Sequence, residues 1–397
     1  YKFLKKKLKT NVYFFMGDLD KETKSKFSYL KEGEIILLEN IRFFDGENKD
    51  EDSFAEILAS LGDIYINDAF SCSHRKQASI HKITKYINES YAGPLLKKEI
   101  EAINSVIQNK NEPVTCIIGG SKISTKINVI TNLIKKVNNI IIVGAMANNF
   151  LTFKGFEIGK SLIEKNSEKI IKDIYAEAKK YNCNIFIPED CNVSTDFKGS
   201  GKIKKQDAIG IDEIILDIGP KTIKNIENII DQSNTVLWNG PAGYFENKTF
   251  STGTLAIASK ISENTAKKSL ISILGGGDTV SAINKSNDKF TFTHLSTAGG
   301  AFLEFLEGKD LPEPVKEERN HTSRIGLERQ GHQIVHDLLG FDLQVRGEGV
   351  VAGKFVIRLG NRVVNGLELA PHAFLHGTKG LEIFLQFIAV PTGQGFL

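Results

Sequence analysis

A run of glycines that ends in an acidic and a hydroxyl residue offers the clearest chemistry in this sequence. Gly276 and Gly277 follow an apolar run and precede Asp278 and Thr279, after which helical spacing begins. Glycines let backbone N–H groups approach an anion closely, and a helix start adds partial positive charge. Asp278 could hold Mg²⁺ on a bound phosphate, and the Thr279 hydroxyl could bond a phosphate oxygen. Either residue could also be only a helix N-cap, so the loop alone leaves both interpretations open.

A second glycine loop, at Gly119 and Gly120, is followed by Lys122 and Lys126. We expect the loop to open a helix, on which these two lysines share one face because they are four residues apart. Two stacked ammonium groups repel each other unless they meet an anion, and a polyphosphate is a natural partner. The loop does not match the Walker A pattern G-x-x-x-x-G-K-[ST]. Two solvent-exposed lysines remain the alternative interpretation in so lysine-rich a chain.

Other polar residues follow strand-like runs in the same way. Loops begin at Gly144, at Gly219 and at Asn239, and the last of these continues to Glu246. Arg42 and Arg75 also follow strand-like runs, and they are the only arginines before residue 313. Arginine binds phosphate or carboxylate through a planar, bidentate geometry that lysine does not have. The alternative for both arginines is an ordinary structural salt bridge.

The elements that must position these loops alternate between strands and helices. Apolar runs predict strands, and helical spacing predicts helices over 126–136 and 167–180. Such alternation predicts parallel, doubly wound sheets, in which ligands bind beyond the carboxyl ends of the strands. The strand-like runs are 34–38, 64–66, 114–118, 140–143, 184–187, 235–238 and 270–274. A long helical stretch from Pro94 to about Asn109 is expected to connect two sheets.

The composition sets limits on function. The chain has 397 residues, 41% hydrophobic and 25% charged, with a net charge of +3, which argues against a general nucleic-acid binder. No apolar run is long enough to cross a bilayer, so we expect no membrane partner. Four cysteines without a C-x-x-C pair suit a reducing compartment, and we expect a cytoplasmic monomer. Because the first residue is Tyr1 and not Met, we also expect the natural N-terminus to lie upstream.

The composition changes near Pro312. Six arginines and five of the eight histidines follow this point, whereas lysine becomes scarce. We therefore interpret residues 313–397 as a tail of different coding origin, dispensable for the activity of the rest. A natural additional domain is the alternative. The spacing of His332 and His336 is too loose a signal to predict a metal site.

Taken in order, the motifs resemble those of the phosphoglycerate kinase family. They are LLENIRF, NDAFxxxHR, GGSKISTK, WNGPAGYFE, GGGDT and THLSTAGGAFLE, and the resemblance runs from about Lys2 to Pro312. It implies two Rossmann-like α/β domains of doubly wound parallel sheets with a hinge cleft between them. We expect residues 1–95, with 290–312 returning, to form an incomplete triose-binding domain. Residues 96–289 are expected to form the interdomain helix and the nucleotide-binding domain.

The resemblance also implies the site residues. Lys126, with Gly276, Gly277 and Thr279, would act on the transferring phosphoryl group, while Arg42 and Arg75 would bind 3-phosphoglycerate. Asp278 would hold Mg²⁺, the implied cofactor of the ATP or ADP substrate. The full nucleotide set would be Gly120, Lys122, Lys126, Gly144, Ile215, Leu216, Asn239, Pro241, Tyr244, Glu246, Gly276, Gly277, Asp278 and Thr279.

The sequence also departs from the family pattern. Ile215 stands where the family has a glycine beside the adenine, and the family's opening strand with its catalytic arginine has no counterpart after Tyr1. We therefore expect weak or no kinase activity from this chain, with a nucleotide-binding module without catalysis as the alternative function. An NAD-dependent dehydrogenase is disfavoured because no strand is followed by G-x-G-x-x-G and a downstream acidic residue.

Overall fold

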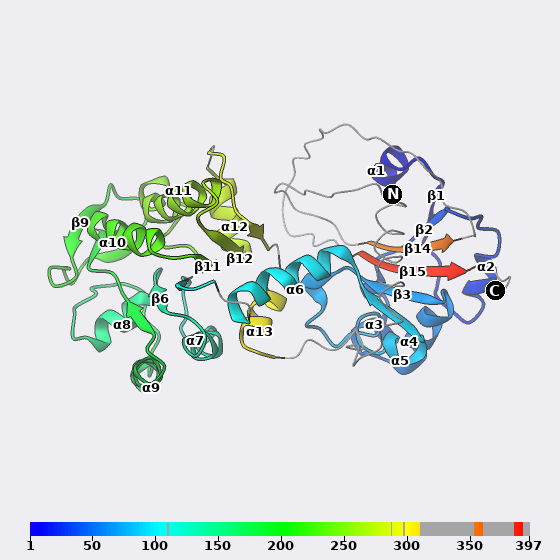
Figure 1. Ribbon diagram of the computed structural model, residues 1–397, viewed down its shortest axis with the longest axis horizontal. Coiled ribbons are helices and arrows are strands. Elements are labelled where there is room, and N and C mark those ends of the chain that lie inside the picture. The colour runs from blue at the N-terminus through cyan, green and yellow to red at the C-terminus, as the bar shows by residue number, and fades with distance from the viewer. Residues whose placement is uncertain (109–110, 287, 297, 310–352, 360–384, 392–397) are drawn as a thin grey trace. The chain divides into compact units, whose positions relative to one another are not determined.

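Two units make up the chain in a computed structural model. The first comprises Tyr1–Lys98 and Asp310–Leu397, and the second comprises Glu99–Lys309. The structure describes residues 1–108, 111–286, 288–296, 298–309, 353–359 and 385–391 (Figure 1). The helix that we expected between two sheets is α6 (Pro94–Ile107).

The second unit contains a six-stranded sheet in which every pair of neighbouring strands is parallel. Its order is β13-β12-β11-β5-β6-β7. The strands are β5 (Val114–Ile118), β6 (Asn139–Ile142), β7 (Asn184–Phe186), β11 (Thr235–Asn239), β12 (Ile271–Gly275) and β13 (His294–Leu295). The predicted parallel α/β fold is confirmed for this unit, with five of these strands within one residue of the expected runs.

Burial explains why these segments form strands and helices. All residues of β5 and β11 are buried, as expected for strands whose two sheet faces are both covered. Helix α7 (Ile127–Ile134) buries Val129, Ile130, Leu133 and Ile134, which recur at helical spacing on one face. The other helices of the unit are α8 (Ala147–Phe153), α9 (Glu168–Lys180), α10 (Pro220–Asp231), α11 (Thr252–Ala266), α12 (Gly277–Asn284) and α13 (Gly300–Leu306).

A second, antiparallel sheet of this unit was not predicted. Its order is β10-β8-β9, with β8 (Asp190–Ser194) between β9 (Lys202–Lys205) and β10 (Ile214–Ile218). The short strand β9 carries three lysines and little apolar pattern, which is why its sequence does not signal a strand.

The segment 290–309 lies in the second unit, which differs from the expectation that it returns to the first. Helix α13 contacts α7, where Asn132 Nδ2 donates a hydrogen bond of 2.6 Å to the Leu306 carbonyl.

The first unit contains a sheet of mixed direction, in the order β1-β2-β14-β15-β3-β4. Strands β1 (Val12–Phe15) and β2 (Ile35–Leu38) are parallel, as are β3 (Ile64–Asn67) and β4 (Glu89–Ala92). Between these two pairs lie β14 (Gly353–Leu359) and β15 (Leu385–Pro391), which come from the tail (Figure 1). They are parallel to each other and antiparallel to β2 and β3, so the expectation of an entirely parallel sheet is wrong here.

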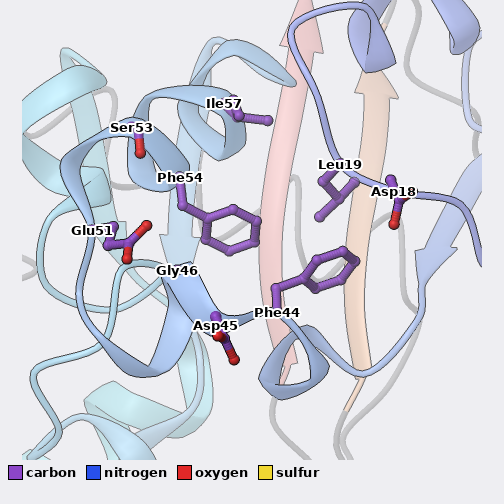
Figure 2. A pocket seen from close by; sticks show the side chains of 9 residues that line it. All are labelled: Asp18, Leu19, Phe44, Asp45, Gly46, Glu51, Ser53, Phe54 and Ile57. Atoms are coloured by element: carbon purple, nitrogen blue, oxygen red, sulfur yellow. The ribbon is translucent and has the colours of Figure 1, made fainter.

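Short helices complete the first unit: α1 (Lys2–Lys7), α2 (Thr23–Lys26), α3 (Asp45–Asn48), α4 (Asp52–Ser60) and α5 (Ile83–Tyr86). A cavity of about 330 Å³ lies between the start of α4 and the loop after β1. Figure 2 shows the Phe44 and Phe54 rings, stacked with centroids 5.4 Å apart, pointing towards Leu19. Carboxylates of Asp18, Asp45 and Glu51 also line it.

None of the helices in the described part of the chain is both long enough and apolar enough to cross a membrane.

Candidate functional site

The loops that follow β5 and β11 meet at the carboxyl edge of the parallel sheet. The Gly119 N–H donates a 2.8 Å hydrogen bond to the Asn239 carbonyl. Gly240 has a φ of 101°, and a side chain there would lie 2.3 Å from the Gly119 carbonyl oxygen. Only glycine allows this backbone approach. The two predicted loops therefore form one continuous surface.

Lys126 points its ammonium group into this surface. Its Nζ donates to the carbonyl oxygens of Gly119 and Asn239 and to the Asn239 side-chain oxygen. Asn239 in turn donates from Nδ2 to the Gly275 carbonyl, at 2.8 Å, which connects β5, β11 and β12. Burial lowers the pKa of Lys126 to about 8, while the nearby Asp278 carboxylate acts in the opposite direction. An arriving anion would favour the ammonium form.

The predicted pairing of Lys122 and Lys126 on one helix face is wrong. Helix α7 begins at Ile127, and Lys126 is its N-cap residue, so Lys122 lies in the preceding turns. Lys122 is exposed there and lies near Glu164, whose side chain accepts a 3.0 Å hydrogen bond from the Ser124 N–H. Its role as a nucleotide ligand stays a prediction.

The glycine loop after β12 does open a helix, as predicted. Gly276 has a φ of 100°, and α12 begins at Gly277, so the first N–H groups of the helix face outward at the end of the sheet. Asp278 is exposed in this first turn. The Thr279 hydroxyl is buried; it accepts from the Gly240 N–H at 2.7 Å and donates to the Gly275 carbonyl at 3.1 Å. The hydroxyl proton is thus donated to a carbonyl within the protein, whereas we expected it to be donated to a phosphate oxygen.

A pocket of about 470 Å³ lies beside these loops. Eight of the predicted nucleotide residues line it: Gly120, Gly144, Ile215, Leu216, Pro241, Tyr244, Glu246 and Asp278. Lys126, Asn239 and Thr279 belong to the adjoining hydrogen-bond network, and a side chain at Gly120 would lie 3.4 Å from Lys126 Nζ. Gly276 lies beside this network, where a side chain would lie 2.8 Å from Asn239 Nδ2. The structure therefore brings most of the predicted set together around one cavity.

Several residues of the pocket were missed. Leu151, Leu162 and Phe197 supply apolar lining, and Lys160 supplies a charge that also pairs with Asp212 at 2.7 Å. Their sequence positions do not directly follow a strand-like run that ends in a glycine loop, which was the pattern used to predict the site. Ile215 also lies in this apolar part of the lining. Apolar lining with a few polar groups is typical of a nucleoside site.

Arg42 and Arg75 lie in the first unit, on two loops that are connected. Arg42 belongs to η1 (Ile41–Phe43), and Arg75 follows η2 (Phe70–Cys72). The Arg42 carbonyl accepts from Asn48 Nδ2 at 2.9 Å, and Asn48 Oδ1 accepts from Gln77 Nε2 at 3.2 Å. The Gln77 N–H donates to the Arg75 carbonyl at 3.1 Å. This chain of contacts places the two arginine-bearing loops next to each other.

No cluster of three or more His, Cys, Asp or Glu side chains suited to a metal occurs in the described residues. All four cysteines are free and buried. Burial raises the pKa of Cys191, beside the pocket, to about 12, so its thiol is inert at neutral pH.

Comparisons with known proteins agree with this geometry. The sequence matches the family model described as phosphoglycerate kinase over residues 1–309. It is 44% identical over 308 residues to a phosphoglycerate kinase of Wolbachia pipientis wMel, covering 77% of each chain. It is 42% identical over 311 residues to one of Methylorubrum extorquens (strain PA1), covering 78% of each. A solved phosphoglycerate kinase structure from Coxiella burnetii matches 78% of each chain with a TM-score of 0.72 and 38% identity.

Proposed function

Because the chain belongs to the phosphoglycerate kinase family, a family of glycolytic phosphotransferases, we propose that its pocket binds Mg-ATP or Mg-ADP. The proposed reaction is a reversible phosphoryl transfer. ATP and 3-phosphoglycerate form ADP and 1,3-bisphosphoglycerate in one direction, and the reverse reaction regenerates them. The observation that carries the proposal is the Lys126–Asn239 network beside the 470 Å³ pocket. At this network, the Lys126 ammonium group and the start of α12 lie beside a pocket with apolar lining.

The chain's own groups would act mainly through charge and position, since phosphoryl transfer needs little covalent help from a protein. Lys126 would exchange some of its carbonyl partners for phosphoryl oxygens, where its charge stabilises the charge that develops during transfer. The first N–H groups of a helix have no carbonyl partner within the helix, so those of Gly277 and Asp278, at the start of α12, would donate hydrogen bonds to phosphate oxygens. Leu162, Ile215 and Phe197 would cover the base and exclude water.

The residues present fit a magnesium ion held chiefly by the nucleotide. Asp278 is an exposed carboxylate at the pocket, close enough to Lys126 to influence its pKa, and the exposed Glu246 is a second carboxylate in the lining. Magnesium commonly uses one or two carboxylates together with phosphate oxygens and water, which this arrangement allows. When bound, the ion would neutralise phosphate charge, and Asp278 would orient it.

In the first unit, Arg42 and Arg75 would bind the phosphate or carboxylate of 3-phosphoglycerate. Their neighbouring loops support this assignment, because two guanidinium groups can then share one small anion. We further propose that the chain is a cytoplasmic monomer. The four free, buried cysteines support a reducing compartment, and size-exclusion chromatography with light scattering tests the oligomeric state.

Two experiments separate the kinase from the alternative, a nucleotide-binding module without catalysis. Calorimetric titration of the full chain with Mg-ADP tests the pocket, with Lys126→Ala as the variant and Lys135→Ala as an exposed control. A coupled assay in both directions then tests turnover. Binding with turnover supports the kinase, and binding without turnover supports the alternative. A well-folded chain that shows no heat with Mg-ADP would contradict both.

A further inference from the structure

The loop 241–246 forms one wall of the nucleotide pocket and is hydrogen-bonded to the first turn of α11. The Thr254 hydroxyl oxygen accepts hydrogen bonds from the Ala242 N–H at 2.9 Å and the Gly243 N–H at 3.4 Å. On the other side, the Tyr244 N–H donates to the Leu216 carbonyl of β10 at 2.7 Å. Thr254 is fully buried and does not line the pocket, so its role is to hold this wall.

Asp217 holds the same turn of α11 in place. Its Oδ2 accepts from the Gly253 N–H at 2.8 Å, its Oδ1 accepts from the Ile218 N–H at 2.9 Å, and the Thr252 N–H also bonds to it. Side chains at Gly243 and Gly253 would lie 2.4 and 2.5 Å from Asp217 Oδ1. The carboxylate is therefore held between β10, α11 and the loop; Asp217 is almost fully buried and also belongs to the residues that line the pocket.

We propose that Asp217 is a positioning residue that acts through Thr254 on the loop 241–246, so that nucleotide affinity depends on its ionisation. The proposal rests on the nucleotide site proposed above. An ionised carboxylate accepts all these N–H groups. A neutral acid turns one oxygen into a donor that faces N–H groups, which weakens the attachment of α11 and of the wall that it carries.

The surroundings support titration near neutrality. Burial raises the pKa of Asp217 to about 7, against the opposing effect of its backbone hydrogen bonds. The ionisable groups on the packed elements are Cys191 and Asp190 of β8 and Tyr244, Glu246 and Lys248 of the loop and the turn after it. The thiol of Cys191 stays neutral in this range, and Lys126, with a pKa of about 8, titrates above it.

The pH dependence of stability and that of nucleotide affinity should have opposite signs, which distinguishes a positioning role of Asp217 from general destabilisation of the fold. Because the folded pKa lies above the ordinary 3.8, Asp217's contribution to stability is fully present below about pH 3.8 and is lost progressively as pH rises from there through about 7. Affinity should move the other way and fall as pH drops below 7. A general loosening of the fold cannot produce both trends.

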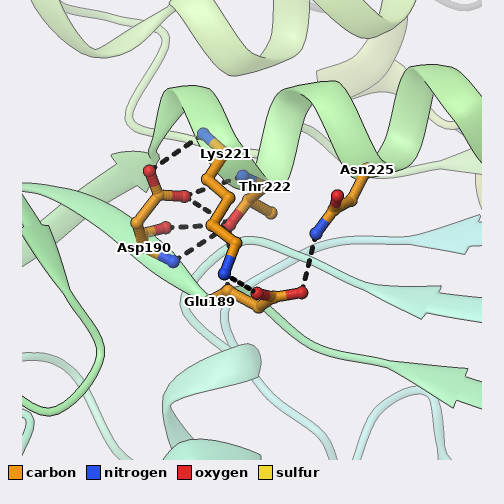
Figure 3. Close-up of polar contacts among 5 residues, drawn as sticks. All are labelled: Glu189, Asp190, Lys221, Thr222 and Asn225. Atoms are coloured by element: carbon orange, nitrogen blue, oxygen red, sulfur yellow. Dashed lines mark hydrogen bonds and ion pairs between the residues drawn. The ribbon is translucent and has the colours of Figure 1, made fainter.

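A matched control comes from the buried Asp190, which caps a different helix. Figure 3 shows Asp190 accepting from the backbone N–H groups of Lys221 and Thr222, at 2.9 and 2.7 Å, at the start of α10. The Thr222 hydroxyl also donates to Asp190 at 2.7 Å. Among the described contacts, none joins Asp190 to the loop 241–246. Asp190→Asn therefore removes an equivalent capping charge without acting on the wall.

The test is calorimetric titration of the full chain with Mg-ADP at pH 6 and pH 7.5, with thermal unfolding measured alongside. The unmodified chain should lose about fivefold or more in affinity at pH 6. Asp217→Asn, which resembles the neutral acid, should bind weakly at both pH values. Asp190→Asn should keep the pH dependence, and so should Thr254→Ser, which retains the hydroxyl. Thr254→Val should bind more weakly than Thr254→Ser at pH 7.5.

Each outcome decides the proposal separately from the pocket itself. If the unmodified chain binds Mg-ADP but Asp217→Asn keeps its affinity and pH dependence, the positioning role is wrong while the nucleotide site stands. If Asp217→Asn does not fold, the Thr254 pair decides, and equal affinities of Thr254→Ser and Thr254→Val would overturn the proposal. The nucleotide's own phosphate titration near pH 6 is common to all variants and cancels between them.

Discussion

The two six-stranded sheets of this molecule are assembled in different ways. The sheet of the second unit takes all its strands from Val114 to Leu295 and keeps them parallel. The sheet of the first unit takes β14 and β15 from beyond residue 350 and places them between β2 and β3. A sheet built from one stretch depends on its own connections. The stability of a sheet that includes strands from a distant segment depends also on the pairing of that segment with the rest of the sheet.

The strongest way to test this comparison is to remove residues 310–397. β2 and β3 would then each lose one of their two partner strands, which splits the sheet into two pairs with unpaired backbone edges, so the first unit should lose its structure. The interpretation drawn from composition, that the tail is dispensable for the activity of the rest of the chain, would instead leave this unit unchanged. The second unit should keep its Mg-ADP affinity, because none of its strands is removed. Hydrogen exchange should show unchanged protection in the sheet of the second unit and loss of protection in the first, above all at 35–38 and 64–67. Retained protection there would contradict the pairing.

Matched core substitutions should separate the units next. Ile117→Ala in β5 and Ile36→Ala in β2 each remove a fully buried side chain, and such changes cost about 2–5 kcal/mol of unfolding free energy. Each should destabilise its own unit, as followed by hydrogen exchange of amides in both sheets. Equal loss of protection in both units from either variant would show that they unfold as one.

Within the second unit, Lys126→Ala should reduce turnover more than nucleotide affinity. Its charge matters most where charge develops, and losing such a contact typically costs about 2.7–4 kcal/mol of barrier. In a coupled assay we expect a lower kcat, with Mg-ADP affinity changed less. Lys135→Ala, an exposed lysine just after α7, should change neither. A raised KM with unchanged kcat would assign Lys126 to ground-state binding instead.

The smallest expected effect is a proton uptake by Lys126. Burial lowers its pKa to about 8, and bound phosphates should raise it again, so binding above pH 8 should take up a proton. Mg-ADP affinity should therefore fall by up to about tenfold from pH 8 to pH 9. Calorimetry in two buffers of different ionisation enthalpy measures the uptake. Lys126→Met should abolish it; an unchanged uptake in that variant would point to another group.

Sequence patterns were sufficient where local chemistry determines structure. β5 is a largely apolar run bounded by Pro113 and Gly119, and its predicted bounds match the structure. The small sheet was missed because β9 has almost no apolar period. The pairing of β14 with β2 joins residues over 300 positions apart, and nothing local to either strand indicates the other.

The candidate site divides in the same way. Glycine loops located Asp278 and the Lys126 surroundings, because close backbone approach requires glycine. The partner of Thr279 could not be predicted because a hydroxyl in a first helical turn can bond outward or inward, and here it bonds the Gly275 carbonyl; its phosphate role stays a prediction. Phe197, in the loop between β8 and β9, and Asp217, inside β10, were missed because a single aromatic or acidic residue carries no spacing signal. Their roles follow only from what folding brings beside them.

The position of β14 and β15 also has a consequence for synthesis. On the ribosome, β2 emerges early, whereas its partner β14 emerges only after the whole second unit. At about 5–20 residues per second, the delay is on the order of tens of seconds. During that time, β2 and β3 have open edges while the second unit can already fold. The nascent chain should therefore depend on chaperones at its N-terminal strands for longer than at its nucleotide site.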